Sequence, residues 1–350
     1  MTTDFTNSFI LNSLKLPIIT NIDSLANTLG LSKTIIFLLS QKTSYYYKPF
    51  KILKKDGNSR QIFSPSYSLK LVQRWILNEI LEKIDVSHES MAYKKGNDNG
   101  IKKNAEMHKY NLYLLEFDLK DFFTSIKRER VFFMFKNLGY NNMVSNILTN
   151  ICTYNDYLPQ GGVCSPYISN LVCYRLDKRL SALCGKRGIV YTRYADDLTF
   201  SCDNKQSLKK VKDIIKDIIE SEQFKINDSK TRLLSPTSHK RVTGITVNDN
   251  KLKANKNMKK LVRAMIIKSL FSMDYINNNI IKGYIAFINS IEDGYKCKII
   301  EYINKTINKS LPYSNEMVIA YNENKFFKET NDMCYHGYDN IDDKYEDYEG

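Results

Sequence analysis

The sequence predicts an α+β fold, and three observations support this class. Apolar residues recur at helical spacing along much of the 350-residue chain. A compact apolar segment at residues 112–117 and two neighbouring segments at 188–195 and 198–202 have the length and apolar pattern of strands. The composition, with 43% hydrophobic and 26% charged residues, is ordinary for a globular chain, and the length suits two or three packed units. A disordered regulator, a collagen-like fibre and a coiled-coil rod are therefore excluded.

The first part of the chain predicts short helices and one hairpin. Gly30 suits the left-handed end of one helix, and Ser32 suits the N-cap of the next. An aromatic and apolar run on either side of a turn at residues 55–58 predicts a hairpin. In chain order the predicted elements are helices at 22–29 and 31–39, a hairpin at 45–63 and a helix at 69–84.

The centre of the chain alternates between predicted helices and strands. After the strand at 112–117, the predicted elements are helices at 122–138, 143–154 and 165–183, strands at 188–195 and 198–202, and a helix at 207–219 with a basic outer face. From residue 251 onward the pattern is again helical and basic. Residues 331–350 are expected to be disordered.

The charge distribution favours a polyanionic partner. Lysine and arginine number 52 against 38 acidic residues, which gives a formal net charge of +14. Residues 331–350 hold seven acidic residues and one lysine, so residues 1–330 carry +20. Nucleic acid is the usual partner of such a body, although the composition of an AT-rich genome would produce the same excess. The role of the acidic tail and the oligomeric state stay open.

The sequence lacks the features typical of membrane-spanning and secreted proteins. No apolar stretch is long enough to span a bilayer, and residues 1–10 lack the basic start of a secretory signal. The seven cysteines have no CxxC spacing, which argues for reduced thiols and against a zinc site or a disulfide framework. We therefore expect a cytoplasmic protein with no membrane association.

Three aspartates are the candidate catalytic and metal-binding residues. Asp196 and Asp197 lie between two predicted strands, at a hairpin tip, where adjacent carboxylates repel each other unless a cation lies between them. A simple Asp-rich turn is the alternative. Asp118 ends the apolar strand, so a strand end beside the hairpin tip would place three carboxylates around two divalent metals for phosphoryl transfer. Hard oxygen ligands without His or Cys favour Mg²⁺, two ions per active site.

Three motifs, in this order along the chain, resemble those of reverse transcriptases. They are Asp118 with Phe122-Phe123, then Leu158-Pro159-Gln160-Gly161 with Ser165-Pro166, then Tyr194-Ala195-Asp196-Asp197. The resemblance covers about residues 45–310, and the fixed order makes it specific. It implies an RNA-directed DNA polymerase with a right-hand architecture of fingers, a palm of antiparallel sheet plus helices, and a helical thumb. The implied domains are N-terminal helices and fingers (1–110), palm with remaining fingers elements (111–240), thumb (241–320) and a disordered acidic tail (321–350).

The resemblance also implies roles for individual residues. Asp118 and Asp196 would bind the metals, and Asp197 would support them. Phe123 would be the steric gate that stacks on the deoxyribose and excludes a 2′-hydroxyl, with Phe122 as the alternative inward-facing ring. The remaining nucleotide-binding residues implied are Gln160 and Gly161 in the pocket, Arg60 and Lys54 on the triphosphate, and Lys230 as a proton donor to pyrophosphate. For Lys54 a solvated hairpin lysine is the alternative.

Two further motifs resemble those of retron reverse transcriptases in particular. Asn104-Ala105-Glu106-Met107-His108 matches the pattern NAxxH, and Val242-Thr243-Gly244 matches VTG. The residues implied in RNA binding are Asn104, His108, Val242, Thr243 and Gly244. In the predicted thumb, the candidates for binding the nucleic-acid backbone are Lys256, Lys259, Lys260 and Arg263, with Leu261, Met265 and Ile266 turned to the core.

A retron enzyme implies a defined reaction and defined partners. It would recognise its own structured non-coding RNA, prime from a guanosine 2′-hydroxyl and copy part of the RNA with dNTPs into branched RNA–DNA, known as multicopy single-stranded DNA (msDNA). The resemblance also implies anti-phage defence together with an effector protein encoded nearby. The identities of the RNA, the effector and its trigger cannot be deduced from this chain.

Two alternatives remain. One is a reverse transcriptase of a group II intron or a diversity-generating element, although a maturase extension would need more residues and the NAxxH and VTG motifs would be unexpected. The other is a scaffold that binds RNA and an effector, with catalysis secondary. The presence of all three aspartates argues against a chain that has lost catalysis.

Overall fold

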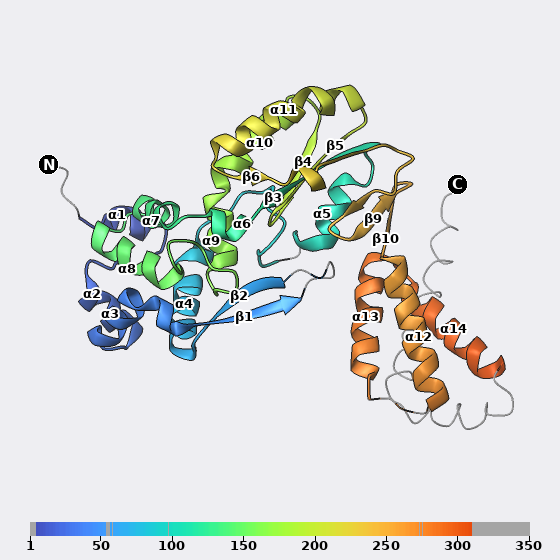
Figure 1. Ribbon diagram of the computed structural model, residues 1–350, viewed down its shortest axis with the longest axis horizontal. Coiled ribbons are helices and arrows are strands. Elements are labelled where there is room, and N and C mark those ends of the chain that lie inside the picture. Colours follow the sequence, from blue (N-terminus) through green and yellow to red (C-terminus); the bar gives the residue numbers. More distant parts are fainter. Residues whose placement is uncertain are drawn as a thin grey trace, which may run out of the picture. The chain divides into compact units, whose positions relative to one another are not determined.

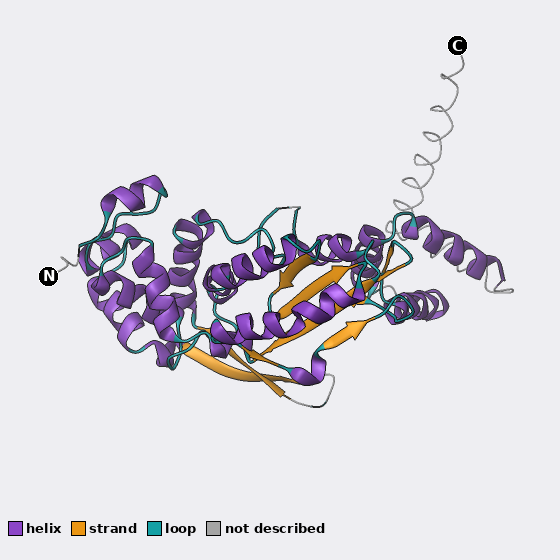
Figure 2. Cartoon of the chain, turned by 90° about the horizontal axis from the view of Figure 1, so that it is seen from above, coloured by secondary structure: helices purple, strands orange, loops and turns teal. Residues whose placement is uncertain are grey.

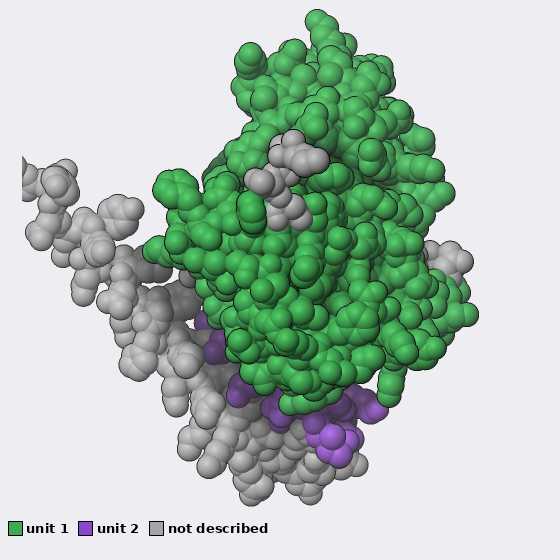
Figure 3. Space-filling model, turned by 90° about the vertical axis from the view of Figure 1, so that its left-hand side faces the viewer, with its two compact units in different colours: residues 1–243 green, residues 244–350 purple. Residues whose placement is uncertain are grey.

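The computed structural model describes residues 5–53, 57, 59–96, 98–272, 274 and 276–309. Lys54 and the acidic tail at 321–350 lie outside these residues. The chain forms two compact units, residues 1–243 and 244–350 (Figures 1 and 3). The division falls three residues beyond the expected start of the thumb.

The N-terminal part of the first unit is helical. Gly30 ends the second helix with φ +64°, and the Ser32 side chain accepts a hydrogen bond from the Ile35 N–H at the start of the third, so both predicted caps are confirmed. The helices of this region are α1 (Ser8–Ser13), α2 (Ile22–Leu29), α3 (Lys33–Gln41), α4 (Tyr67–Glu79) and α8 (Asn142–Cys152), with short 3-10 turns η1 (Thr43–Tyr46) and η2 (Leu81–Lys83).

The predicted hairpin is confirmed as a long antiparallel pair, β1 (Tyr47–Leu53) and β2 (Ser59–Pro65). Tyr47 lies opposite Pro65 at the base of the hairpin. The base is buried and the strands become exposed toward the tip. The hairpin therefore extends from the helical region with its root fixed in the core (Figure 1).

A central antiparallel sheet carries the three candidate aspartates. Its strands run in the order β4, β5, β3, β6, and β7 pairs with β3 as well. The register places Asp118 directly opposite Asp197. The strands are β3 (Tyr113–Lys120), β4 (Val190–Tyr194), β5 (Asp197–Cys202), β6 (Lys225–Ile226) and β7 (Arg232–Leu234).

The two faces of this sheet have different roles, because successive side chains point to opposite sides. Helices α10 (Tyr174–Gly185) and α11 (Lys205–Ser221) pack against one face of the sheet (Figures 1 and 2). Phe117, Leu198 and Phe200 lie on this face and are buried. The opposite face carries the aspartates at its end. Helix α5 (Gly100–His108) packs on this second face, through side chains that reach β4 and β5.

Two predicted helices are each broken into two. The segment 122–138 forms α6 (Phe122–Ser125) and α7 (Arg128–Asn137), because Ile126 is extended and its carbonyl accepts from the Leu158 N–H, 2.9 Å away. The segment 165–183 forms α9 (Ser165–Val172) and α10, with Cys173 between them. Helical periodicity continues across both breaks, so the pattern alone did not reveal them.

The second unit is a short hairpin followed by three helices. The elements are β9 (Ile245–Asn248), β10 (Lys251–Lys253), α12 (Lys256–Ser272), α13 (Asn278–Ile291) and α14 (Tyr295–Lys309), preceded in the chain by η3 (Asp228–Lys230) and β8 (Arg241–Val242). Residues 251–253 are strand, so the helical expectation from residue 251 was early by one element. Ile266 is buried as predicted and Met265 is partly buried, whereas Leu261 is 46% exposed and Val262 is buried in its place.

The cysteines among the described residues follow the expectation with one exception. Five of them are buried free thiols, at positions 152, 164, 173, 184 and 202. Cys297 is disulfide-bonded, which departs from the expectation of reduced thiols throughout.

In the described part of the chain, no helix taken singly has the length and apolar character to cross a bilayer. Helices α2 and α3 meet those criteria only as a pair, and that pair bends by 109°.

Candidate active site

A cavity of about 520 Å³ lies at the end of the central sheet where the carboxylates gather. It is lined by β2, the start of α6, the hairpin tip between β4 and β5, and the segment after β6. The cavity brings together residues that are far apart in the sequence. Those already singled out from the sequence are Arg60, Asp118, Phe123, Gln160, Asp196 and Lys230.

Asp118 is the most enclosed of the three aspartates, at 8% exposure. Its Oδ1 accepts from the Asn227 Nδ2 at 3.1 Å, and its Oδ2 accepts from the Lys230 Nζ at 2.8 Å. The Asn227 N–H also donates to the Asp118 carbonyl at 2.8 Å. The strand end is thus fixed both by its backbone and by its carboxylate.

The hairpin tip is a tight two-residue turn. Tyr194 lies opposite Asp197, so only Ala195 and Asp196 form the loop. Ala195 is buried and adopts φ +57°, a left-handed conformation that costs a non-glycine residue about 1 kcal/mol or more. The Asp196 carbonyl accepts from the Leu119 N–H at 2.9 Å, which ties the tip to β3.

Crowding of the carboxylates disfavours their charged forms. Burial, and then the nearby Asp118, raise the pKa of Asp196. Burial and the charges of Asp196 and Asp118 raise the pKa of Asp197 to about 6. Two residues before Asp118, burial and the charge of Asp197 raise the pKa of Glu116 to about 7. This site therefore gains from a bound cation.

The carboxylate oxygens suit a hard divalent cation, but only two of the three aspartates face the cavity. Asp118 and Asp196 line the cavity together, whereas Asp197 does not line it. Among the residues that the structure describes, no group of three or more His, Cys, Asp or Glu side chains converges as a metal site. Lys230 donates to the Asp118 Oδ2 and places a cationic group where a metal would compete for the same oxygen.

The opposite wall comes from the β1–β2 hairpin and the loop after residue 157. Arg60 is exposed on β2 and lines the cavity. The Phe63 N–H donates to the Gln160 carbonyl at 2.8 Å, so hairpin and loop are joined. Gly161 has φ +113°, and a Cβ there would lie 2.7 Å from the Phe63 carbonyl oxygen. Only glycine allows this approach, and Gly161 acts by shape, since it does not itself line the cavity.

Phe122 and Phe123 have different surroundings. Phe122 is 4% exposed and its ring stacks on that of Phe224, with centroids 5.8 Å apart. Phe123 is half-buried and, like Phe122, lines the cavity. The geometry therefore suits Phe123 better than Phe122 for contact with a bound sugar.

A buried charged network supports the hairpin from the other face of the sheet. Arg193 and Asp177 are both fully buried and form a two-point ion pair, with the Arg193 Nε 2.8 Å and Nη2 2.7 Å from the carboxylate oxygens. Burial alone would lower the pKa of Arg193, but the charge of Asp177 raises it above its usual value. The Arg193 Nη1 also donates to the Asn170 Oδ1 and, at 3.4 Å, to the Ala195 carbonyl. The turn that carries Asp196 therefore rests on a permanently charged side chain.

The NAxxH residues occupy the interior. Asn104 and His108 are both 0% exposed, so direct contact of their side chains with RNA does not agree with the structure. Thr192 donates to the Asn104 Oδ1, and the two His108 nitrogens lie 2.7 Å from the Ser201 and Thr192 hydroxyls. These bonds attach α5 to the face of the sheet that ends in the aspartates.

The hydrogen bonds around His108 are satisfied by a neutral imidazole with its proton on Nε2. Because the Thr192 hydroxyl donates to Asn104, it accepts from the His108 Nε2–H, while Nδ1 accepts from Ser201. Asn111 in turn donates to the Ser201 hydroxyl at 2.7 Å. Burial lowers the pKa of His108 to about 3.

The VTG residues lie close to the same helix. Val242 is buried, and Thr243, at φ +47°, donates through its hydroxyl to the Ile101 carbonyl at 3.2 Å in α5. Gly244 has φ +84° and is exposed. The first two residues of the motif are therefore placed as structural contacts of α5 and its surroundings.

The basic residues of α12 are only partly available. Lys256, Lys260 and Arg263 are exposed. The Lys259 Nζ forms an ion pair with Glu292 at 2.6 Å, and the Arg263 guanidinium lies over the Tyr302 ring at 5.1 Å. Lys256 and Lys260 remain the better candidates for a nucleic-acid backbone.

Sequence reasoning missed two residues of the cavity wall that matter. Asn227 lies three residues before Lys230 and holds Asp118, but an Asn next to a short strand has no distinctive pattern. Tyr93 lines the cavity from a loop with φ +60°. No local motif in its neighbourhood indicated this position.

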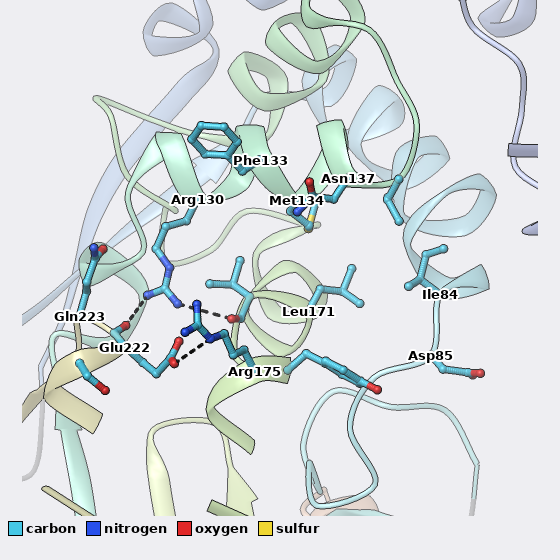
Figure 4. Close-up of a pocket in the computed structure, with 14 residues that line it drawn as sticks. Ile84, Asp85, Arg130, Phe133, Met134, Asn137, Leu171, Arg175, Glu222 and Gln223 are labelled. Carbon is cyan, nitrogen blue, oxygen red and sulfur yellow. Dashed lines mark hydrogen bonds and ion pairs between the residues drawn. The ribbon is translucent and has the colours of Figure 1, made fainter. Parts of the chain in front are cut away.

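A second cavity of about 590 Å³ lies elsewhere in the first unit, between α7, α9 and the end of α11. In Figure 4 the guanidinium groups of Arg130 and Arg175 point toward Glu222, with dashed contacts to it. The Arg175 Nε forms an ion pair with the Glu222 carboxylate, Arg130 donates to the Glu222 main-chain carbonyl, and none of the three aspartates lines this cavity. We therefore place the active site at the smaller cavity.

Comparison with known proteins shows the family to which this chain belongs. Residues 52–260 match the family model described as reverse transcriptase (RNA-dependent DNA polymerase). Among solved structures, the telomerase from Candida albicans is similar with 14% identity and a TM-score of 0.46, over 85% of this chain and 65% of that one. The chain belongs to the reverse transcriptase family and is an RNA-directed DNA polymerase with an α+β fold.

The curated relatives are more specific. The chain is 35% identical over 304 residues to the retron Ec86 reverse transcriptase of Escherichia coli, covering 86% of this chain and 94% of that protein. It is 30% identical over 291 residues to the retron Ec83 reverse transcriptase of the same species, covering 78% and 90%. The retron Mx162 reverse transcriptase of Myxococcus xanthus is 33% identical over 258 residues, 65% of this chain and 53% of that protein. Within the family the chain is a retron reverse transcriptase.

Proposed function

We propose that this polymerase copies its cognate structured non-coding RNA, starting from a guanosine 2′-hydroxyl, into branched RNA–DNA (msDNA). The observation that carries the proposal is the shared cavity of Asp118, Asp196, Arg60, Phe123, Gln160 and Lys230. Its carboxylates lie opposite a cation from the fingers hairpin, an arrangement suited to a nucleoside triphosphate and a primer hydroxyl. An anti-phage role with an effector encoded nearby is part of the same proposal.

In this proposal Asp118 and Asp196 hold two Mg²⁺ ions, with Asp197 in support. When bound, the ions supply activation of the attacking hydroxyl and stabilisation of the leaving pyrophosphate. Arg60, with Lys54, binds the triphosphate, since guanidinium groups match phosphate geometry. Gln160 and Gly161 shape the nucleotide pocket, and Phe123 excludes a 2′-hydroxyl. Lys230 donates a proton to pyrophosphate.

RNA binding is proposed for exposed cations and for the scaffold around α5. Lys256 and Lys260, with Arg263 and Lys259 in lesser part, contact the phosphate backbone. The buried Asn104 and His108 act by holding α5 in place. RNA helices are recognised largely by shape and 2′-hydroxyl contacts, so the surface around α5 is the part of the first unit to test.

The test is to express the gene with its native flanking DNA, purify the protein and analyse the bound nucleic acid. We expect a DNA species whose mobility on a denaturing gel changes after treatment with a 2′,5′-debranching enzyme. Linear cDNA, or RNA alone, would refute the msDNA proposal. An Asp196→Asn/Asp197→Asn variant should make no DNA and give no phage protection. Full protection without DNA synthesis would favour the scaffold alternative.

A further inference from the structure

Tyr93 is a cavity residue to which neither the motifs nor the family resemblance gave a role. It lines the same cavity as Asp118, Phe123 and Asp196. The three residues before it, from Ser90 to Ala92, are at most 2% exposed, whereas Tyr93 is 41% exposed. The chain thus leaves the core at Tyr93 and places its ring at the nucleotide cavity.

The backbone at Tyr93 is strained and is held by its neighbours. Its φ of +60° is unusual for a bulky residue and costs about 1–3 kcal/mol. The Met91 N–H donates to the Arg193 carbonyl at 2.8 Å, and the Asn170 Nδ2 donates to the Ala92 carbonyl at 2.8 Å. Arg193 and Asn170 belong to the buried network that also supports the aspartate turn. The same network therefore fixes the loop of Tyr93 and the hairpin tip.

The ring of Tyr93 meets the proposed sugar gate. Its centroid is 6.4 Å from that of Phe123, with the planes tilted by 50°. Phe123 also contacts Phe122, with centroids 5.3 Å apart, and Phe122 is stacked on Phe224. Phe122 and Phe224 are buried, whereas Tyr93 is 41% exposed, so Tyr93 is the exposed neighbour of Phe123 among these rings.

We propose that Tyr93 is a specificity-determining residue, which holds the Phe123 ring in place and extends the aromatic surface that excludes a ribose 2′-hydroxyl. The inference rests on the proposed role of Phe123 as the sugar gate. Removal of the Tyr93 ring leaves space beside Phe123, so the gate can move away from the sugar. The hydroxyl of Tyr93 is not needed for this effect, since the contact with Phe123 is made by the ring.

The experiment measures incorporation of a single dNTP and of the matching rNTP on one RNA template–primer, with purified full-length protein. In Tyr93→Ala, we expect the efficiency of rNTP relative to dNTP to rise about tenfold or more, mainly through a lower KM for the rNTP. Tyr93→Phe should keep the wild-type ratio within about threefold. Tyr110→Ala, which removes an exposed tyrosine outside the cavity, is the matched control.

Two further variants keep the result interpretable. Tyr93→Gly accepts a positive φ without strain, so it gives the same comparison if the alanine variant folds poorly. The double variant Phe123→Ala/Tyr93→Ala should change the ratio by less than the product of the two single effects, because the two rings belong to the same sugar-excluding surface. An unchanged ratio in folded Tyr93→Ala and Tyr93→Gly would overturn the inference. A wild-type protein that incorporates no dNTP would instead overturn the proposed function, and the inference with it.

Discussion

Asp177→Asn tests the view that a buried ion pair supports the active-site hairpin. The change keeps the shape of the side chain but removes the charge that compensates Arg193, whose side chain is fully buried. In the wild type, Arg193, Ser87 and Tyr191 all donate hydrogen bonds to the Asp177 carboxylate. The asparagine would place an NH₂ donor against some of these donors. Breaking one partner of a buried pair costs about 3–5 kcal/mol.

That magnitude is a large part of the stability of an ordinary domain, about 5–15 kcal/mol. The assay is urea unfolding followed by tryptophan fluorescence and circular dichroism, with the wild type measured beside the variant. Asp228→Asn is the control, because its ion pair with Lys216 is 3.0 Å long but the Asp228 side chain is 77% exposed. Such a pair contributes at most about 1 kcal/mol.

A second substitution separates the charge from the packing. Arg193→Met combined with Asp177→Leu removes both charges, and we expect it to be more stable than Asp177→Asn alone. Primer extension should still fall in the double variant, because the hydrogen bond from Arg193 to the Ala195 carbonyl is lost. If Asp177→Asn costs no more than Asp228→Asn, the reasoning about an uncompensated buried charge is wrong.

Three other predictions concern the site and its support. Gly161→Ala should raise the KM for dNTPs and lower the free energy of unfolding by about 1–3 kcal/mol, because the new Cβ would clash with the Phe63 carbonyl. Gly185 has open space around it, so Gly185→Ala should change neither quantity in the same assays. His108→Gln should flatten the pH dependence of the free energy of unfolding. The wild-type histidine has a pKa of about 3 when folded and about 6.5 when unfolded, so the wild type should lose about 2 kcal/mol of stability between pH 7 and pH 5. Equal losses in the two proteins would contradict this prediction. Lys230→Met should strengthen Mn²⁺ binding about fivefold, measured by calorimetry, because the lysine competes with the metal for the Asp118 carboxylate. The same variant should slow nucleotide incorporation, because it removes the proposed proton donor. Weaker Mn²⁺ binding would refute the competition.

The sequence allowed the main site residues to be predicted because their positions follow from local patterns. A strand with Asp118 near its end and a two-residue turn at Asp196 determine where these carboxylates point, and the structure brings both to one cavity. The strand continues two residues beyond the predicted end, to Lys120. Arg60, Gln160 and Lys230 were placed there through the family resemblance. The prediction of individual catalytic roles stays a prediction.

What could not be predicted depends on tertiary contacts. The partnership of Asp177 with Arg193 joins α10 to β4, and neither residue differs locally from a solvated helix acid or a strand arginine. His108 was expected at an RNA surface, but its two hydroxyl partners on β4 and β5 place it in the interior. Leu261 was expected in the core of the second unit, but the side of α12 that packs against α13 does not include it.

The alternation along β4 also tells a protein engineer where the chain tolerates an insertion. Thr192 points to α5 and Arg193 to α10, so one extra residue in this strand would exchange their surroundings and bury the arginine charge against the wrong helix. The turn between β9 and β10 is the opposite case. Asp249 and Asn250 are exposed there, with φ near +55°, and line neither of the two cavities described above. A fluorophore-acceptor peptide or an affinity tag belongs in that turn.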